Sequence, residues 1–152
     1  MMRFFTMDWW CGVQTGLTEN PADDYFTHLA ELRERVTPEQ QSTLDGLLSL
    51  ALHDSRLFQL RMNAVAAELQ IELKGYQVEE RFTLVYRGVE QFVSEADLER
   101  QLCGSAGYGD LGYDEVDILL SGAFVHRMLF SSGIEMAVTF REFELLREST
   151  SA

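Results

Sequence analysis

The chain has 152 residues, of which 46% are hydrophobic, and its 25 acidic and 12 basic residues give it a formal net charge of −13 at pH 7. A chain of this length can bury the core of one domain without disulfide bonds, and its two distant cysteines, Cys11 and Cys103, exclude a disulfide framework and a metal-ligand spacing. The acidic excess argues against nucleic acid as a partner, because phosphates are neutralised by lysine and arginine, and it is typical of a solubilising surface or of one that attracts a basic protein.

The chain begins with a predicted short helix. Thr6 can cap this helix, and Gly12 and Gly16 disfavour its continuation. Trp9 and Trp10 are adjacent, so they cannot share one narrow helix face. We therefore expect one tryptophan in the core and the other at an edge, and we keep Trp10 as a candidate binding residue.

Two longer helices are predicted next. Asn20 and Pro21 together favour a helix start, and an apolar stripe at helical spacing follows at Tyr25, Leu29, Leu32 and Val36. His28 lies beside that stripe and is expected at the surface. Thr37 begins the next helix, with proline in the first position and Gln40 placed to complete a capping box. These two helices are expected to form a hairpin that packs on a sheet.

Beyond residue 55 the apolar residues alternate, which predicts antiparallel strands with one buried face. The first three inner rows are Phe58, Leu60 and Met62, then Leu69, Ile71 and Leu73, then Phe82, Leu84 and Tyr86. A short helix is predicted over residues 95–102, and a glycine-rich loop follows it. Three more strands are predicted over 113–145, with inner rows Val116/Ile118/Leu120, Phe124/Met128/Phe130 and Ile134/Met136/Val138/Phe140.

Two turns determine the register of these last three strands. Residues 120–122 and 131–133 form three-residue loops, each with glycine in the left-handed third position. This register pairs Met128 with Met136 and places His126 in the buried row, between Val116 and Val138. A two-residue loop would instead bury Arg127, which is costly for an unpaired guanidinium.

Together these elements predict one α+β domain over residues 1–152. Residues 1–52 are expected to be mainly helical, and residues 55–147 mainly antiparallel β with the short helix at 95–102. We expect the helical N-terminal third to pack on one face of an antiparallel sheet of about six strands.

The best local candidate for chemistry is the corner at His53 and Asp54, with Arg56 two residues later. A carboxylate at this position could orient an imidazole. Adjacent side chains seldom pair, however, so the structural alternative is that Asp54 closes the corner through backbone amides while His53 favours the negative end of the preceding helix. His53, Asp54 and Arg56 are kept as candidate binding residues.

Other patterns for catalysis or metal binding are missing from the sequence. It contains no H-E-x-x-H, C-x-x-C, G-x-S-x-G or phosphate-binding glycine motif, and Cys103 lies beside Glu99, which is unfavourable for a thiolate. Asp114 and Glu115 are adjacent on a predicted strand, point to opposite faces and are expected to be solvated. We therefore expect no catalytic residue, no cofactor and no metal.

The chain is also expected to be cytoplasmic and without a membrane partner. It contains no run of about 18 apolar residues, the length that a membrane span needs. Its first ten residues contain one basic residue, an early acid at Asp8 and no small-residue cleavage site, so we do not expect a signal peptide.

Three segments of the chain resemble a group of small bacterial proteins of unknown function. They are M-R-F-F-T-x-x-W at residues 2–9, H-D-S-x-L at 53–57 and Y-D-E-V-D-I…F-V-H-R-M-L-F-S-S-G-I-E-M-A-V-T-F at 113–140. Members of that group begin M-[KR]-[YF]-F-T-x-x-[WY] and carry an H-D-[AS] corner before a β-rich second half. The resemblance implies a bacterial cytoplasmic origin and an α+β fold, and it assigns no catalytic residue.

Three functions remain open. The first is a non-enzymatic protein-binding domain, of the immunity type or an adaptor, that engages a basic protein through its acidic surface or a sheet edge; the comparison with immunity proteins is one of size and charge alone. The second is a small-molecule-binding protein or hydrolytic enzyme with a pocket near His53, Asp54 and His126. The third is a homo-oligomer formed through an exposed edge strand.

Overall fold

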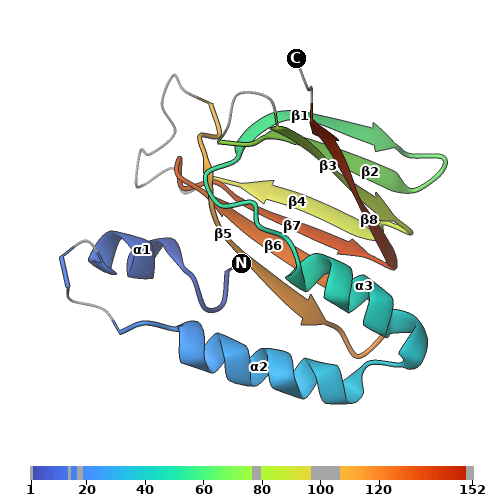
Figure 1. Ribbon diagram of the computed structural model, residues 1–152, viewed down its shortest axis with the longest axis horizontal. Coiled ribbons are helices and arrows are strands. Elements are labelled where there is room, and N and C mark those ends of the chain that lie inside the picture. Colours follow the sequence, from blue (N-terminus) through green and yellow to red (C-terminus); the bar gives the residue numbers. More distant parts are fainter. Residues whose placement is uncertain (1, 14, 17–18, 77–79, 97–106, 150–152) are drawn as a thin grey trace.

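The computed structural model describes residues 2–13, 15–16, 19–76, 80–96 and 107–149. In this part of the chain three helices come first: α1 (Met7–Val13), α2 (Ala22–Arg35) and α3 (Pro38–Leu48). Eight strands follow: β1 (Arg56–Asn63), β2 (Glu68–Lys74), β3 (Glu80–Arg87), β4 (Gln91–Glu95), β5 (Leu111–Ile118), β6 (Phe124–Phe130), β7 (Glu135–Phe140) and β8 (Glu142–Ser149). The fold is α+β with antiparallel pairing, as expected (Figure 1). None of the described helices is long and apolar enough to cross a membrane.

The described strands form two four-stranded sheets, so the prediction of one sheet of about six strands is wrong. Sheet A has the order β1-β2-β3-β8, and sheet B has the order β4-β7-β6-β5. The chain passes from sheet B to sheet A at Arg141, whose backbone N–H donates to the Arg87 carbonyl (3.0 Å). The apolar alternation shifts by one residue at this crossing, because Phe140 is followed by Arg141 and Glu142 before Phe143. The shift marks the end of a strand, but it does not indicate that the next strand joins the other sheet.

The helix predicted at 95–102 is also wrong at its start. Ser94 and Glu95 belong to β4, which pairs with β7, because Phe92 and Val93 supply the half-buried residues of an edge strand. Residues 97–102 of that prediction lie outside the described part of the chain.

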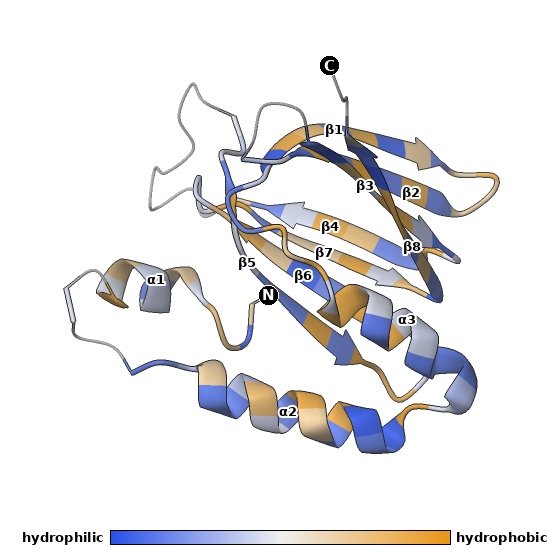
Figure 2. Cartoon of the chain, in the orientation of Figure 1, coloured by the Kyte–Doolittle hydropathy of each residue, from blue (hydrophilic) through white to orange (hydrophobic). Residues whose placement is uncertain are grey.

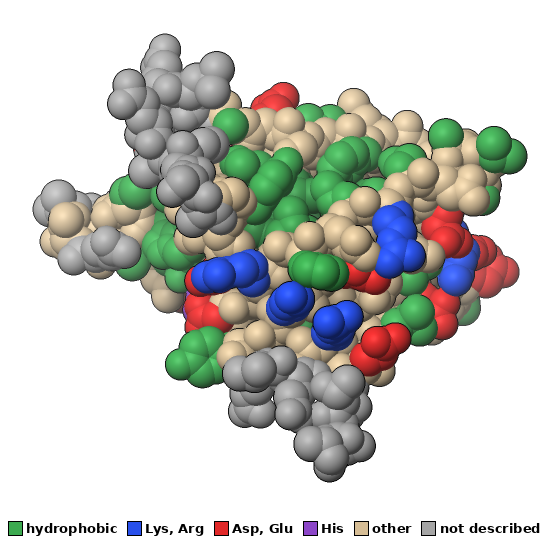
Figure 3. Space-filling model, turned by 90° about the horizontal axis from the view of Figure 1, so that it is seen from above, with side chains coloured by type: hydrophobic (Ala, Val, Ile, Leu, Met, Phe, Trp, Pro, Cys, Tyr) green, Lys and Arg blue, Asp and Glu red, His purple; other side chains and the backbone are tan. Residues whose placement is uncertain are grey.

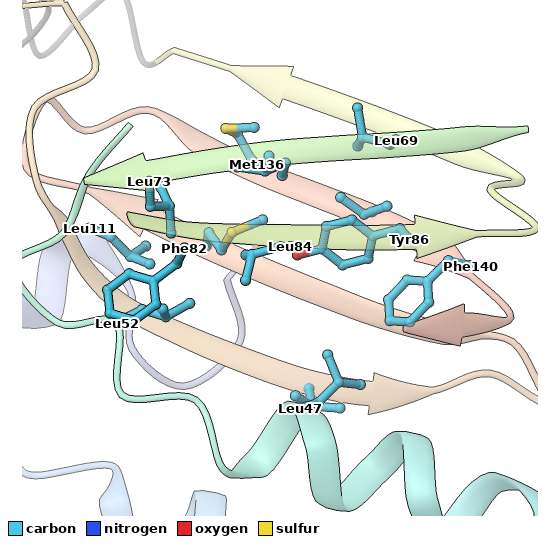
Figure 4. Close-up of a cluster of buried hydrophobic side chains, with 14 of the residues drawn as sticks. Leu47, Leu52, Leu69, Leu73, Phe82, Leu84, Tyr86, Leu111, Met136 and Phe140 are labelled. Atoms are coloured by element: carbon cyan, nitrogen blue, oxygen red, sulfur yellow. The ribbon is translucent and has the colours of Figure 1, made fainter. Parts of the chain in front are cut away.

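The core lies between the two sheets, whose strands carry apolar and polar residues in alternation (Figure 2). Figure 4 shows inward side chains of both sheets meeting, with Leu47 of α3 below them. We expected the helices to form one layer over one sheet. Instead, α3 contacts β8 of sheet A and α2 contacts β5 of sheet B.

The register predicted for β5, β6 and β7 is confirmed. His126 pairs with Val116 on one side and Val138 on the other, and Met128 pairs with Met136. The third residue of each turn has the left-handed conformation that the loop requires, with φ of 86° at Gly122 and 84° at Gly133. His126 is therefore fully buried on the inner face of sheet B.

The first strand differs from its prediction. A bulge between Leu57 and Gln59 shifts the register, so Leu57 pairs with Leu73 and Leu60 with Ile71. Phe58 consequently leaves the buried row, and its side chain is 49% exposed. Strands β2 and β3 have the predicted inner rows.

The predicted caps of α1 and α3 are present, whereas the predicted burial of residues in α1 and α2 is partly wrong. Thr37 and Gln40 form the predicted capping box, and Thr6 Oγ1 accepts a hydrogen bond from the Trp9 N–H (3.2 Å). No residue of α1 is buried, so neither of its tryptophans lies in the core. His28 was expected at the surface and is instead largely covered, because Phe4 and Tyr25 flank its ring.

Candidate functional site

A groove runs between α2, α3 and the edge strand β5, and it is the best-defined candidate site. Its volume is about 430 Å³. The wall residues are Tyr25, Phe26, Leu29, Ala30, Arg33, Leu47, Leu48, Leu50, Asp114 and Val116. Two of them are charged: Arg33 already faces Asp45 (3.3 Å), whereas Asp114 lies on the strand and is 29% exposed. The groove therefore combines apolar walls with a carboxylate, a composition common among binding sites.

A buried hydrogen-bond chain holds that carboxylate in place. Asp114 Oδ2 lies 2.8 Å from His126 Nε2, and His126 Nδ1 lies 2.7 Å from the Tyr86 hydroxyl. A carboxylate can only accept, so Nε2–H donates to Asp114. In the neutral imidazole this leaves Nδ1 without a proton, and Nδ1 accepts from the Tyr86 hydroxyl. Burial, with the nearby charge of Asp114, raises the pKa of Tyr86 well above its ordinary value, so the hydroxyl stays protonated.

The strand pattern explains how these three residues meet. Asp114 and Val116 are two apart on β5 and share its inner face, and Val116 is paired with His126 of β6. Asp114 is thus the diagonal neighbour of His126, within reach of its ring. Tyr86 comes from β3 of the opposite sheet. The chain of bonds runs from the middle of the core to the groove.

Tyr25 connects α2 to the exposed side of β5. The Val116 backbone N–H donates to the Tyr25 hydroxyl (2.9 Å), so an edge amide of sheet B is satisfied by a helix side chain. Burial raises the pKa of Tyr25, an effect that the Val116 bond opposes and that the carboxylates of Asp114, Glu115 and Asp117 reinforce. Tyr25 therefore stays protonated and closes one end of the groove.

The opposite face of β5 carries two buried acids that fasten the N-terminal segment. Glu115 accepts hydrogen bonds from the backbone N–H groups of Arg3 (2.9 Å), Phe4 (2.6 Å) and Phe5 (2.7 Å). The prediction that Glu115 is solvated is wrong, since it is almost fully buried. Only the fold supplies these amides, because they come from more than a hundred residues earlier in the chain.

Asp117 holds a second group of contacts on this face. It lies 2.6 Å from Arg3 Nη1 and 3.4 Å from both His28 Nε2 and Arg127 Nη1. Burial alone would raise the pKa of Asp117, but the Ile118 N–H, the Arg3 and Arg127 guanidinium groups and the nearby His28 ring outweigh it and lower the pKa. Asp117 is therefore a paired anion in the folded protein.

The predicted corner residues lie apart from the groove. His53 Nδ1 donates to the Gly112 carbonyl (2.6 Å), and the backbone N–H of Asp54 donates to the Leu111 carbonyl (2.9 Å). Arg56 Nε lies 3.2 Å from Asp110 Oδ1. These bonds tie the corner to the start of β5.

Within the corner, two details differ from the sequence prediction. The adjacent His53 and Asp54 do approach each other, at 3.4 Å from Nε2 to Oδ1, and their side chains are 61% and 55% exposed. His53 bonds to a strand carbonyl, where we had expected it to interact with a helix end. His126 takes Tyr86 and Asp114 as its partners, so the structure does not bring it together with His53.

Trp10 packs against Tyr113, with ring centroids 5.2 Å apart, and borders a cavity of about 300 Å³ with Met7, Cys11 and Ser131. It is half-buried, so it supplies packing for α1 as well as some accessible surface. Cys11 is exposed, and Cys103 lies outside the described residues. Among the residues with described positions, no group of three or more His, Cys, Asp or Glu could hold a metal ion.

The groove is better suited to binding than to proton transfer. Of the described residues that line it, Tyr25 alone has a hydroxyl, and that hydroxyl is held by Val116 with its pKa raised. Asp114 accepts from a buried imidazole and offers its remaining lone pairs to the groove. Such a carboxylate can pair with a cation.

No family model matches the chain, and no curated protein shows significant sequence similarity to it.

Proposed function

We propose that this chain is a non-enzymatic protein-binding domain and that the groove between α2, α3 and β5 takes a basic side chain of its partner. One observation carries the proposal: Asp114 is partly exposed, fixed by His126, and set among apolar walls. A lysine or arginine side chain has the matching form, since its stem is apolar and its head is cationic. A charge-assisted hydrogen bond at the carboxylate would hold the head in place.

The charge around the groove supports the same partner. The net charge of −13 attracts basic proteins over a distance of several ångströms and speeds their association. Helix α2, which forms one wall, adds exposed acids at Asp23 and Asp24, near its start. These residues would steer a basic segment toward Asp114.

A hydrolytic site near His53, Asp54 and His126 has less support. Catalysis would need these groups to act on one substrate, yet His53 bonds to the Gly112 carbonyl and His126 bonds within the core. Tyr86, the other polar group of the chain of bonds, is fully buried and cannot reach a ligand.

The test uses a charge change that keeps the hydrogen bond. Asp114→Asn retains an oxygen that accepts from His126 Nε2–H and removes the negative charge. Binding is measured by amide chemical shifts with a capped tripeptide of leucine, arginine and leucine, and with its glutamate counterpart. We expect the arginine peptide to shift groove amides, the glutamate peptide to leave them unchanged, and Asp114→Asn to weaken arginine-peptide binding about tenfold.

Asp54→Asn is the matched control, because it removes the same charge from the exposed corner outside the groove. It should bind the arginine peptide like the wild type. Equal binding by Asp114→Asn and the wild type, or equal weakening by the two variants, contradicts the proposal.

A further inference from the structure

Three basic residues lie in register across one end of sheet A. Arg56 pairs with Lys74, and Lys74 pairs with Arg81, so their side chains share the outer face of β1, β2 and β3. Like charges directly opposite on neighbouring strands destabilise a sheet. Figure 3 views the molecule from above, where basic side chains gather in a row beside hydrophobic ones. A row of three is notable in a chain with 12 basic residues and a net charge of −13, because abundance of basic residues does not account for it.

Two of these charges have no carboxylate partner among the residues that the structure describes. Arg56 has Asp110 at 3.2 Å, but in the described part of the chain neither Lys74 nor Arg81 has a carboxylate oxygen within 4.0 Å. Glu148 is the strand partner of Arg81 and still forms no such pair. Elsewhere on this face the basic residues are neutralised, as with Arg61 and Glu72 (3.1 Å).

The two unmatched cations lie against an exposed aromatic ring. Lys74 Nζ is 4.1 Å from the centroid of the Phe58 ring, and Arg81 Cζ is 5.7 Å from it. The bulge in β1 turns Phe58 to this face and leaves it 49% exposed. Cation–π contacts hold the charged groups near the ring without neutralising them.

Phe58 and Arg56 also line a pocket of about 330 Å³, the size of a site for a small ligand. Its other walls are Leu57, Gln59, Leu60, Gly107, Tyr108 and Gly109. Tyr108 is held in place, since its hydroxyl lies 3.0 Å from Ser94 Oγ and its ring packs on Phe130. The cationic row and a pocket with apolar walls therefore meet at Phe58.

We propose that this end of sheet A is a second binding site and that it takes a small organic anion. A carboxylate or phosphate meets Lys74 and Arg81, while the apolar body of the ligand packs on Phe58 and enters the pocket beside Tyr108. A compact anion suits the site better than a long polyanion, because the net charge of −13 repels charges that extend beyond the row. The site lies apart from the Asp114 groove and does not depend on what the groove binds.

The experiment titrates the protein with four probes and follows amide chemical shifts. Phenyl phosphate and phenylacetate carry the proposed anion and ring, inorganic phosphate lacks the ring, and benzylamine reverses the charge. We expect both ring-bearing anions to shift the amides of residues 56–60, 74, 81 and 107–109 at millimolar concentration. Whichever of the two binds more tightly shows whether the site prefers a phosphate or a carboxylate. Inorganic phosphate should bind more weakly than phenyl phosphate, and benzylamine should leave these amides unchanged.

Variants then separate the contributions. The double variant Lys74→Gln, Arg81→Gln should weaken phenyl phosphate binding about tenfold, whereas Arg61→Gln, a charge removed from the same sheet face, should not. Phe58→Ala should lower affinity for phenyl phosphate and leave inorganic phosphate unaffected. Asp114→Asn should bind phenyl phosphate normally, which separates this site from the groove. The proposal is overturned by unchanged affinity in the double variant, by equal affinity for phenyl and inorganic phosphate, or by equal binding of benzylamine.

Discussion

The hydroxyl of Tyr86 in sheet A lies 2.7 Å from Nδ1 of His126 in sheet B, in a hydrogen bond that crosses the core between the two sheets. Both residues are fully buried, and the Tyr86 ring also packs edge-on against Phe140 (4.8 Å). A polar bond inside an apolar core is satisfied at one alignment of the sheets and lost at others. The pair thus favours one stacking of the sheets and, through Asp114, the geometry of the groove.

Tyr86→Phe should destabilise the protein by about 1–2 kcal/mol, because it leaves His126 Nδ1 buried without its donor. Urea denaturation measures the loss. Tyr108→Phe is the matched control, since it also removes one hydroxyl, but from an exposed contact with Ser94, and should change stability by less than about 0.5 kcal/mol. Similar losses in the two variants would argue against a special role for the buried bond.

The sequence predicted the position of His126 but not its partners. Period-two alternation and the turn glycines Gly122 and Gly133 are local features, and together they determine the register that buries His126. Its bond to Tyr86 joins two sheets. Alternation looks the same in one sheet or two, so nothing local predicted that Tyr86 would face His126.

The acidic strand β5 shows the same limit. Local rules placed Asp114 and Glu115 on opposite faces, which is correct, and treated both as solvated, which is wrong for Glu115. A buried carboxylate is stable only with partners, and the partners of Glu115 are backbone amides near the start of the chain. Every residue except proline carries a backbone N–H, so the sequence does not indicate which of them converge on Glu115.

Glu115→Gln should destabilise the protein by about 3 kcal/mol. A carboxylate accepts from the three N–H groups of Arg3, Phe4 and Phe5, whereas the amide of glutamine would point its own donors at some of them. Denaturant unfolding gives the loss, and amide hydrogen exchange shows whether residues 3–5 are released first.

Glu135→Gln is the control for this change. It removes the same charge from a residue that accepts one amide, that of Met2, at 3.2 Å. We expect it to cost less than about 1 kcal/mol. An equal loss in the two variants would mean that net charge, and not the three amide bonds, causes the effect.

Acid should destabilise the folded protein in part by protonating Asp117. Its pKa is lowered in the folded protein from an ordinary value of 3.8, so the unfolded chain binds the proton more readily. The stabilisation that this carboxylate provides is therefore complete well above pH 3.8 and is lost as the pH falls through the folded pKa. We expect the stability difference between the wild type and Asp117→Asn to be constant near neutral pH and to shrink below about pH 4, as measured by urea denaturation at each pH. A difference that does not change with pH would assign the effect of the variant to lost packing.

The contact of Trp10 with Gly112 and Tyr113 attaches α1 to sheet B, and a substitution at Gly112 tests it. A Cβ atom added at Gly112 would fall inside contact distance of the Trp10 indole, which is itself held against Tyr113. Gly112→Ala should therefore destabilise the protein by about 1–2 kcal/mol, and in a Trp10→Ala background that cost should largely disappear, which a double-mutant cycle measures. Gly46→Ala is the control: its Cβ would meet Phe143 at an ordinary 3.8 Å, and alanine favours the helix interior, so it should stabilise by about 0.5–1 kcal/mol. If Gly112→Ala costs the same with and without Trp10, the strain lies in the strand backbone and the indole does not hold α1 at this position.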